Sequence, residues 1–259
     1  MSNAIAQPLR VWEYWLAQYR RVWRGTVITS VINPVFYLGA LGVGLGTLVN
    51  KSGGAPLGVP YLDFVAPGML ASAAMQVAAG EAMWPVVGSF KWTRQYFAMI
   101  ATPLGVRDVV LGHQMFMLAR LAATTAIYLC VIAAFGAIDS FWGILAFPAA
   151  VLVGVAFTAP LAAYAATREQ EAAFVPINRF VILPMFLFSG TFFPVSRLPL
   201  PLEWLAYATP LWHGVELCRM LTLGEVDAWR ALGHVALLLA LAIGGLVWAQ
   251  RTYARRLFT

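Results

Sequence analysis

Long runs of apolar residues alternate with short polar stretches along the chain, and six of the runs are long enough to cross a membrane. A helix needs about 20 residues to span the hydrocarbon core of a bilayer. The predicted spans cover residues 26–49, 63–89, 108–135, 141–166, 172–193 and 231–250. Pro67 and Pro85 fall inside the second run, and we expect them to break its helix. The pattern predicts an all-α, polytopic membrane protein that forms a single transmembrane domain over residues 1–259.

Residues 8–24 precede the first span, and their apolar side chains recur at helical spacing. The apolar positions are Val11, Trp12, Trp15, Leu16, Tyr19 and Val22. Arginines occupy much of the rest of this stretch, and a helix with one apolar and one basic face lies in the plane of a membrane interface. We therefore predict an N-terminal amphipathic interfacial helix; the alternative is a basic flank that only precedes a span.

Residues 194–223 are too interrupted to form another span. Pro199 and Pro201 precede two short apolar pieces, residues 202–208 and 212–223. Neither piece reaches the length that a bilayer requires. We predict re-entrant or interfacial half-helices here, before the last span.

A polar, basic segment, residues 91–107, separates the second and third spans. Its cations are Lys91, Arg94 and Arg107, and its apolar residues include Tyr96, Met99 and Ile100. Residues 101–105 contain Thr, Pro and Gly, which predicts that a helix stops there in a turn. We expect a short helix that uses its apolar residues as a contact face, at the place where a cytoplasmic partner acts on the membrane part. The alternative is a solvated loop.

The composition supports the membrane class. Hydrophobic residues make up 61% of the 259 residues and charged residues only 11%, whereas an ordinary soluble domain is about a quarter charged. An outer-membrane barrel would show alternating segments of ~10 residues instead of unbroken runs. The net charge of +6 belongs to cations that flank the spans, so we expect no nucleic-acid partner.

Those cations also predict the orientation in the membrane. Eleven Lys and Arg residues outside the spans lie on the side that holds both termini, the basic segment and Arg168, against four on the other side: Lys51, Arg197, Arg219 and Arg230. Positive residues concentrate in cytoplasmic loops. We predict a bacterial cytoplasmic (inner) membrane protein with both termini in the cytoplasm and residues 194–223 outside; no cleavable signal peptide is expected.

Three charged residues, Glu81, Arg120 and Arg179, fall inside predicted spans, where a charge is costly and usually faces a bundle interior or a wet cavity. Glu81 and Arg120 lie at similar depths, roughly 15 and 20 Å from the cytoplasmic end at ~1.5 Å per residue. They are therefore a possible ion pair. Such a pair either fixes helix packing or belongs to a transport path, and the sequence leaves both interpretations open.

No catalytic set is apparent. The histidines His113, His213 and His234 are scattered, and Cys130 and Cys218 have no nearby partner for a disulfide or a metal. A glycine-rich stretch ends near Lys51, but Asn50 stands where a phosphate-binding loop needs glycine. We expect neither an enzyme nor an ATP site in this chain.

Four stretches in order resemble the permease subunits of ABC-2 type exporters, especially the nodulation lipo-oligosaccharide and drug-exporter branches. They are Asn33 to Tyr37 with the glycines that follow, Tyr61 to Gln76, Tyr96 with Met99 to Leu104, and Leu187 to Pro194 followed by Leu198-Pro199, Pro210-Leu211 and Glu216 to Arg219. Together they cover nearly the whole chain, at the spacing of the family.

The resemblance implies a half-transporter, in which a second permease, identical or related, and separate ABC ATPase subunits complete the machine. ATP and Mg would be bound by those ATPase subunits. The implied ATPase-coupling residues are Lys91, Arg94, Tyr96, Met99, Ile100, Thr102 and Pro103, within a coupling segment over 91–105, together with Trp12, Trp15 and Tyr19 of the interfacial helix. Residues 194–223 correspond to an outer lid. The predicted substrate path or lid comprises Glu81, Arg120, Arg179, Phe188, Ser189, Gly190, Phe192, Phe193 and Pro194, although the two arginines are outside the family pattern.

The predicted function is thus the membrane subunit of an ATP-driven exporter that moves an amphipathic or lipid-linked molecule, a lipo-oligosaccharide, glycolipid or drug. The alternative is a proton-coupled secondary transporter that uses Glu81 and His113. A six-span membrane enzyme is disfavoured because the catalytic set is missing.

Overall fold

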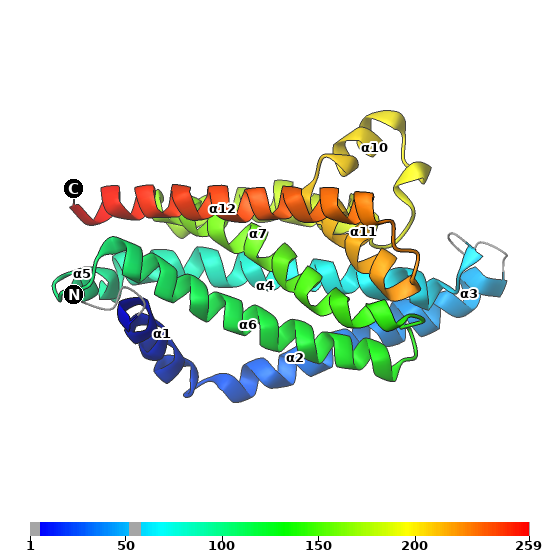
Figure 1. Ribbon diagram of the computed structural model, residues 1–259, viewed down its shortest axis with the longest axis horizontal. Coiled ribbons are helices and arrows are strands. Elements are labelled where there is room, and N and C mark those ends of the chain that lie inside the picture. Colours follow the sequence, from blue (N-terminus) through cyan, green and yellow to red (C-terminus); the bar gives the residue numbers. More distant parts are fainter. Residues whose placement is uncertain (1–5, 52–57, 259) are drawn as a thin grey trace.

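The computed structural model describes residues 6–51 and 58–258, and within these ranges every regular element is helical (Figure 1). Six helical segments are long and apolar enough to cross a membrane, which confirms the predicted number of spans. They are Trp23–Lys51, Tyr61–Lys91, Val106–Ala134, Phe141–Ala166, Glu171–Phe188 and Ala228–Phe258. The loop between the first two spans lies in part outside the described residues.

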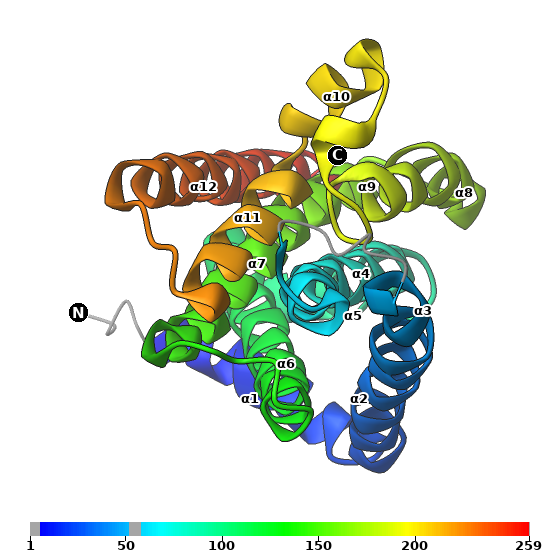
Figure 2. The ribbon, with the colours of Figure 1, turned by 90° about the vertical axis from the view of Figure 1, so that its right-hand side faces the viewer.

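The second span, α4 (Tyr61–Lys91), is the central helix of the bundle (Figure 2). Its neighbours include α6 (Val106–Ala134), α7 (Ala146–Ala166, preceded by η3, Phe141–Leu145) and α11 (Pro210–Leu223). The prediction that Pro67 and Pro85 break this span is wrong, because α4 is one continuous helix. Prolines are tolerated where neighbouring helices surround the backbone groups that they free.

Two spans contain short π-helical segments. The first consists of α2 (Trp23–Tyr37), η1 (Leu38–Leu45) and α3 (Gly46–Lys51). The fifth consists of η4 (Glu171–Ala173), α8 (Phe174–Ile177), η5 (Asn178–Ile182) and α9 (Leu183–Phe188). It was expected to continue to residue 193 but ends at Phe188, because Gly190 takes a left-handed conformation (φ 81°) and turns the chain.

The last span, α12 (Ala228–Phe258), includes the residues that the sequence suggested as a separate basic tail. Arg256 donates hydrogen bonds to the carbonyl oxygens of Ala166 (3.0 Å) and Arg168 (2.6 Å) at the end of α7. A guanidinium that binds the free carbonyls of a helix C-terminus also interacts favourably with the helix dipole. This contact explains why the helix continues to Phe258.

The N-terminal amphipathic helix is shorter than predicted. α1 (Ala6–Tyr19) ends before the turn over residues 20–22, and α2 begins at Trp23, so the predicted boundary at residue 24 is wrong. Val22, assigned to the apolar face, is exposed in this turn. The helix lies across the end of the bundle and packs on α6, with Val11 and Trp15 buried between them (Figure 1).

Short helices occupy residues 194–223, as the proline pattern predicted. They are η6 (Val195–Arg197), α10 (Leu200–Tyr207) and α11. They lie at the end of the bundle opposite α5 (Gln95–Ile100) and the end of α12 (Figure 1). Their re-entrant character stays a prediction.

Two adjacent glycines of α12 provide a matched test of its packing on α7. A methyl group at Gly245 would lie 2.5 Å from Cδ of Pro160, whereas one at Gly244 would meet nothing within 4 Å. We expect Gly245→Ala to lower the free energy of unfolding by about 1–3 kcal/mol, because overpacking forces the helices apart. Gly244→Ala should leave it unchanged or raise it by up to ~1 kcal/mol. Thermal unfolding of the purified variants measures both effects, and equal melting temperatures would contradict the packing described here.

Candidate functional site

The basic segment between the second and third spans contains a short helix, as predicted. Arg94 adopts a left-handed conformation (φ 49°), which reverses the chain after α4 and starts α5. Residues 101–103 then form the expected turn before α6. Lys91, Arg94, Thr102 and Pro103 are exposed, whereas Ile100 is half-buried.

Tyr96 points into its own chain, which differs from the expectation that it offers its ring to a partner. The side chain is fully buried, and its hydroxyl shares a 2.6 Å hydrogen bond with Nδ1 of His113 on α6. Burial, with Tyr253 nearby, raises the pKa of Tyr96 well above its ordinary value, so the phenol stays protonated. Trp15 of α1 stacks flat on the His113 ring at 4.0 Å. Tyr96 therefore links α5 to α6, because its hydroxyl bonds a residue of its own chain and not a partner.

The surface that α5 does expose is a groove shared with α1. It has a volume of about 290 Å³, and its lining includes Arg10, Tyr14, Ala98, Met99 and Thr102. Met99 is buried at its base, and the hydroxyl of Tyr14 donates to Oε1 of Gln95 at 2.7 Å, which bridges the two helices. The groove was not apparent from the sequence, because the sequence alone does not place α1 beside α5.

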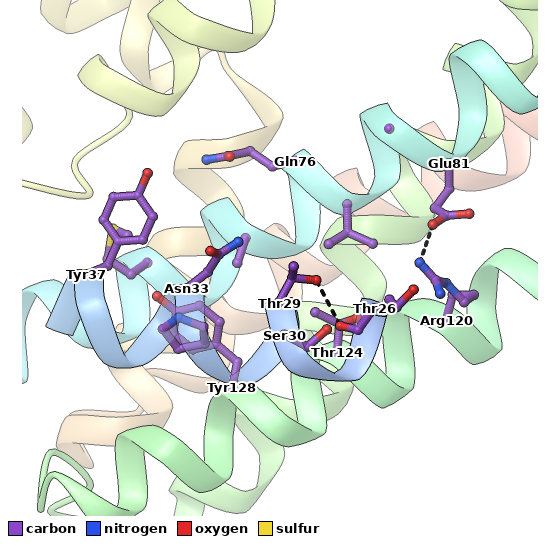
Figure 3. A pocket seen from close by; sticks show the side chains of 15 residues that line it. Thr26, Thr29, Ser30, Asn33, Tyr37, Gln76, Glu81, Arg120, Thr124 and Tyr128 are labelled. Atoms are coloured by element: carbon purple, nitrogen blue, oxygen red, sulfur yellow. Dashed lines mark hydrogen bonds and ion pairs between the residues drawn. The ribbon is translucent and has the colours of Figure 1, made fainter. Parts of the chain in front are cut away.

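Glu81 and Arg120 form an ion pair between α4 and α6 at 2.5 Å, which confirms the suggested partnership (Figure 3). The Arg120 guanidinium also lies 4.4 Å from the ring centre of Tyr19, the last residue of α1. Trp12 and Tyr19 are half-buried. Tyr19 of the predicted interfacial helix and the Glu81–Arg120 pair thus meet in one place.

Arg179 is separate from this pair. It lies on η5 with an exposed side chain, next to a second cavity of about 490 Å³ that is also lined by Gln76 and Trp84 of α4. No described residue forms an ion pair with it. Arg179 therefore presents an uncompensated charge on the surface of a spanning segment.

The predicted lid residues after the fifth span pack on α4. Ser189, Gly190 and Thr191 are buried, Phe192, Phe193 and Pro194 are half-buried, and Phe188 is exposed. The hydroxyls of Thr191 and Ser72 are hydrogen-bonded at 2.9 Å, and Tyr61 donates to the carbonyl oxygen of Phe192 at 3.1 Å. Ser189 bonds Thr209 at the start of α11. Hydrogen bonds thus connect this non-helical segment, residues 189–194, to α4 and to the start of α11.

Arg219 of α11 was counted among the cations of the outer side, within a predicted half-helix, but only 4% of it is exposed. Its guanidinium donates to the carbonyl oxygen of Gly190 at 2.6 Å, pairs with Glu216 and lies 4.0 Å from the ring centre of Phe64. Burial lowers the pKa of Arg219, while Glu216 acts in the opposite direction. The sequence signal was weak, because an Arg three residues after a Glu on a short helix is typical of an exposed pair.

The described residues form six helices that can span a membrane, an amphipathic N-terminal helix and a short loop helix at one end, which is the architecture of a multi-pass membrane protein. The chain belongs to the ABC-2 type transporter family, whose model matches residues 9–223. It is 32% identical over 232 residues to Nodulation protein J of Rhizobium leguminosarum bv. trifolii, covering 86% of this chain and 87% of that protein. It is 31% identical over 249 residues to Nodulation protein J of Sinorhizobium fredii, covering 93% and 92%.

Replacing Arg219 tests its importance for the outer half of the bundle. Arg219→Lys keeps the charge but removes the planar fork, so we expect the Gly190 carbonyl to lose its donor at a cost of about 1–3 kcal/mol in the free energy of unfolding. The control is Arg230→Lys, because Arg230 is exposed and pairs with Asp227 at the same spacing of three residues. That change should cost no more than a few tenths of a kcal/mol. Thermal unfolding distinguishes them, and equal losses would show that burial of Arg219 is unimportant.

Proposed function

We propose that this chain is the permease subunit of an ATP-driven exporter that moves an amphipathic or lipid-linked molecule out of the cytoplasm or the inner leaflet. The supporting observation is the connection between the exposed groove of α1 and α5 and the spans. Tyr96 and Trp15 belong to the two helices that line the groove, and both contact His113 of α6. A force on the groove therefore reaches a spanning helix through packed, hydrogen-bonded side chains.

The groove is the proposed docking site for a separate ABC ATPase, which would bind ATP and Mg. Its apolar base, Met99 and Val11, suits an apolar anchor of the partner, while Lys91, Arg94 and Arg10 form exposed basic surroundings. Buried anchors contribute most of the binding energy, and charges at the rim mainly affect the association rate. The coupling role of segment 91–105 thus stays with α5, but its contact surface becomes Ala98 and Thr102 instead of Tyr96.

A second permease subunit, identical or related, would cover the face that carries Arg179. An uncompensated arginine is costly against lipid and is usually directed at protein or a wet cavity. Asn33 and Gln76 are exposed within spans on the same side of α4, beside the cavities that share Gln76. A partner subunit would give all three residues a polar environment and would place them along the substrate path.

The outer end of the path would be closed by residues 189–194 with α10 and α11. Arg219 holds this segment against α4 through the carbonyl oxygen of Gly190 and the ring of Phe64. In this orientation both termini lie in the cytoplasm of a bacterial inner-membrane protein. Burial of Arg219 removes one of the four cations counted on the outer side, which increases the bias of exposed cations toward the cytoplasm.

The alternative of a proton-coupled secondary transporter has less support in the geometry. Glu81 is engaged by Arg120, and His113 is 2% exposed between Trp15 and Tyr96. A proton carrier needs alternate access to water, and neither side chain has it without breaking these contacts.

The ATP-driven exporter and the proton-coupled transporter differ in their source of energy, and this difference can be tested. The chain purified from its native membranes in mild detergent should bring with it an ABC ATPase whose ATP hydrolysis is inhibited by vanadate. Export from cells should stop when ATP is depleted while the proton gradient is maintained. Purification without an ATPase, together with export abolished by an uncoupler at constant ATP, would establish the proton-coupled alternative.

Filling the groove tests the docking site. Ala98→Trp should reduce the amount of co-purified ATPase at least tenfold, because the indole occupies the space that the partner anchor needs, while the permease remains folded. Gln170→Trp is the matched control, since Gln170 is exposed in the loop before η4 and lies outside the groove. Full retention of the ATPase by Ala98→Trp would show that the ATPase docks elsewhere.

A further inference from the structure

Three helices direct polar side chains into one cavity between them (Figure 3). On α2 these are Thr26, Thr29, Ser30, Asn33 and Tyr37; on α6 they are Arg120, Thr124 and Tyr128; on α4 they are Gln76 and Glu81. Within α2 and α6 the polar residues recur every three or four positions, which places them on a single face of each helix.

The other face of α2 is apolar and exposed. Its exposed residues include Ile28, Val31, Ile32, Val35 and Phe36. A spanning helix with one apolar and one polar face places the apolar face in lipid and the polar face inside the bundle. The polar stripe of α2 therefore faces the cavity, and Thr29, Asn33 and Tyr37 in it are also exposed on the surface of the subunit.

Two groups in the cavity lack a partner among the residues that the structure describes. The hydroxyl of Tyr128, a residue that is only 3% exposed, and the Nε–H of Arg120 are buried and make no hydrogen bond with any described residue. Buried polar groups in proteins are nearly always hydrogen-bonded. The Nε–H of Arg120 can only donate and the hydroxyl of Tyr128 can donate or accept, so a molecule that satisfies both must supply at least one acceptor, and a hydroxyl group can serve either residue.

The charges in the cavity are already balanced. Glu81 and Arg120 pair with each other, and no other described residue of the lining is charged. A charged ligand would leave an uncompensated charge in the bundle or would break this pair, and either is costly. The site therefore favours an uncharged group over an anion or a cation.

We infer that this cavity, of about 230 Å³, binds the uncharged, hydroxyl-bearing head group of an amphiphile within a single subunit. This is smaller than the roughly 300–1,000 Å³ typical of sites for drug-sized ligands, so the space suits one small head group and not a chain of several. Acceptor oxygens of the head group bind Tyr128 and Arg120, while Asn33 and Gln76 offer further amide contacts. The identification of this ligand as the exported molecule rests on the proposed function, whereas binding itself needs no ATPase.

Equilibrium binding to the permease alone in lipid nanodiscs tests the site. The probe is radiolabelled octyl β-glucoside below its micellar concentration, with octyl sulfate and octyltrimethylammonium as charged competitors with the same alkyl chain. We expect saturable glucoside binding that the charged competitors displace at least tenfold less effectively than unlabelled glucoside. Binding only in proportion to that of empty nanodiscs, or equal displacement by a charged competitor, would overturn the assignment.

Two variants locate the binding in the cavity. Tyr128→Phe keeps the ring and removes only the unpartnered hydroxyl, and Asn33→Leu replaces a polar group on a different helix with an apolar one of similar size. Each should weaken glucoside binding at least fivefold, whereas Tyr164→Phe on α7, outside the lining, should not. Wild-type affinity in both cavity variants would refute the site. Because no ATPase is present, this result is independent of the groove experiment. If the wild-type permease fails to bind the glucoside but still co-purifies with the ATPase, the cavity assignment is refuted and the proposed export function is not.

Discussion

The end of the bundle that holds α10 and α11 depends on burying the guanidinium of Arg219 with enough partners. Its contacts come from three parts of the chain that are far apart in sequence: Glu216 on its own helix, the ring of Phe64 on α4, and the carbonyl oxygen of Gly190. The free carbonyl exists because Gly190 turns the chain and ends the fifth span. A segment without helical hydrogen bonds is thereby held next to α4, and Arg219 satisfies one of its buried backbone carbonyls.

The opposite end of the bundle has a different arrangement, in which aromatic rings surround a short buried hydrogen bond. Tyr96 and His113 share that bond, and Trp15, Phe90 and Tyr253 pack around it. Three of these rings come from α1, α5 and α12, so the two short helices at this end and the last span share one core. The two ends thus differ in character: one holds a buried charge with several partners, and the other holds an aromatic cluster around the hydroxyl of Tyr96.

The sequence predicted the helical class, the number of spans, the short helix after α4 and the Glu81–Arg120 pair, because length, hydropathy and charge placement depend on local sequence. It failed where the outcome depends on which elements become neighbours. Helical spacing correctly grouped Tyr96 with Met99 as one face, but it does not say whether that face meets a partner or the same chain. Burial of Arg219 likewise depends on Gly190, 29 positions earlier. The polar stripe of α2 was detectable, since its period is visible in the sequence.

α1 connects these features, because its two aromatic side chains contact different parts of the machinery. Trp15 stacks on His113 of the aromatic cluster, and one turn later Tyr19 lies against the guanidinium of Arg120. Arg120 in turn pairs with Glu81 and lines the polar cavity. A displacement of α1 by a partner in the groove would therefore alter the position of Arg120 directly, without any rearrangement of the spans in between. Packed side chains transmit such displacements because interiors are dense and deform little. α1 would thus provide a direct route between the proposed docking groove and the proposed ligand cavity.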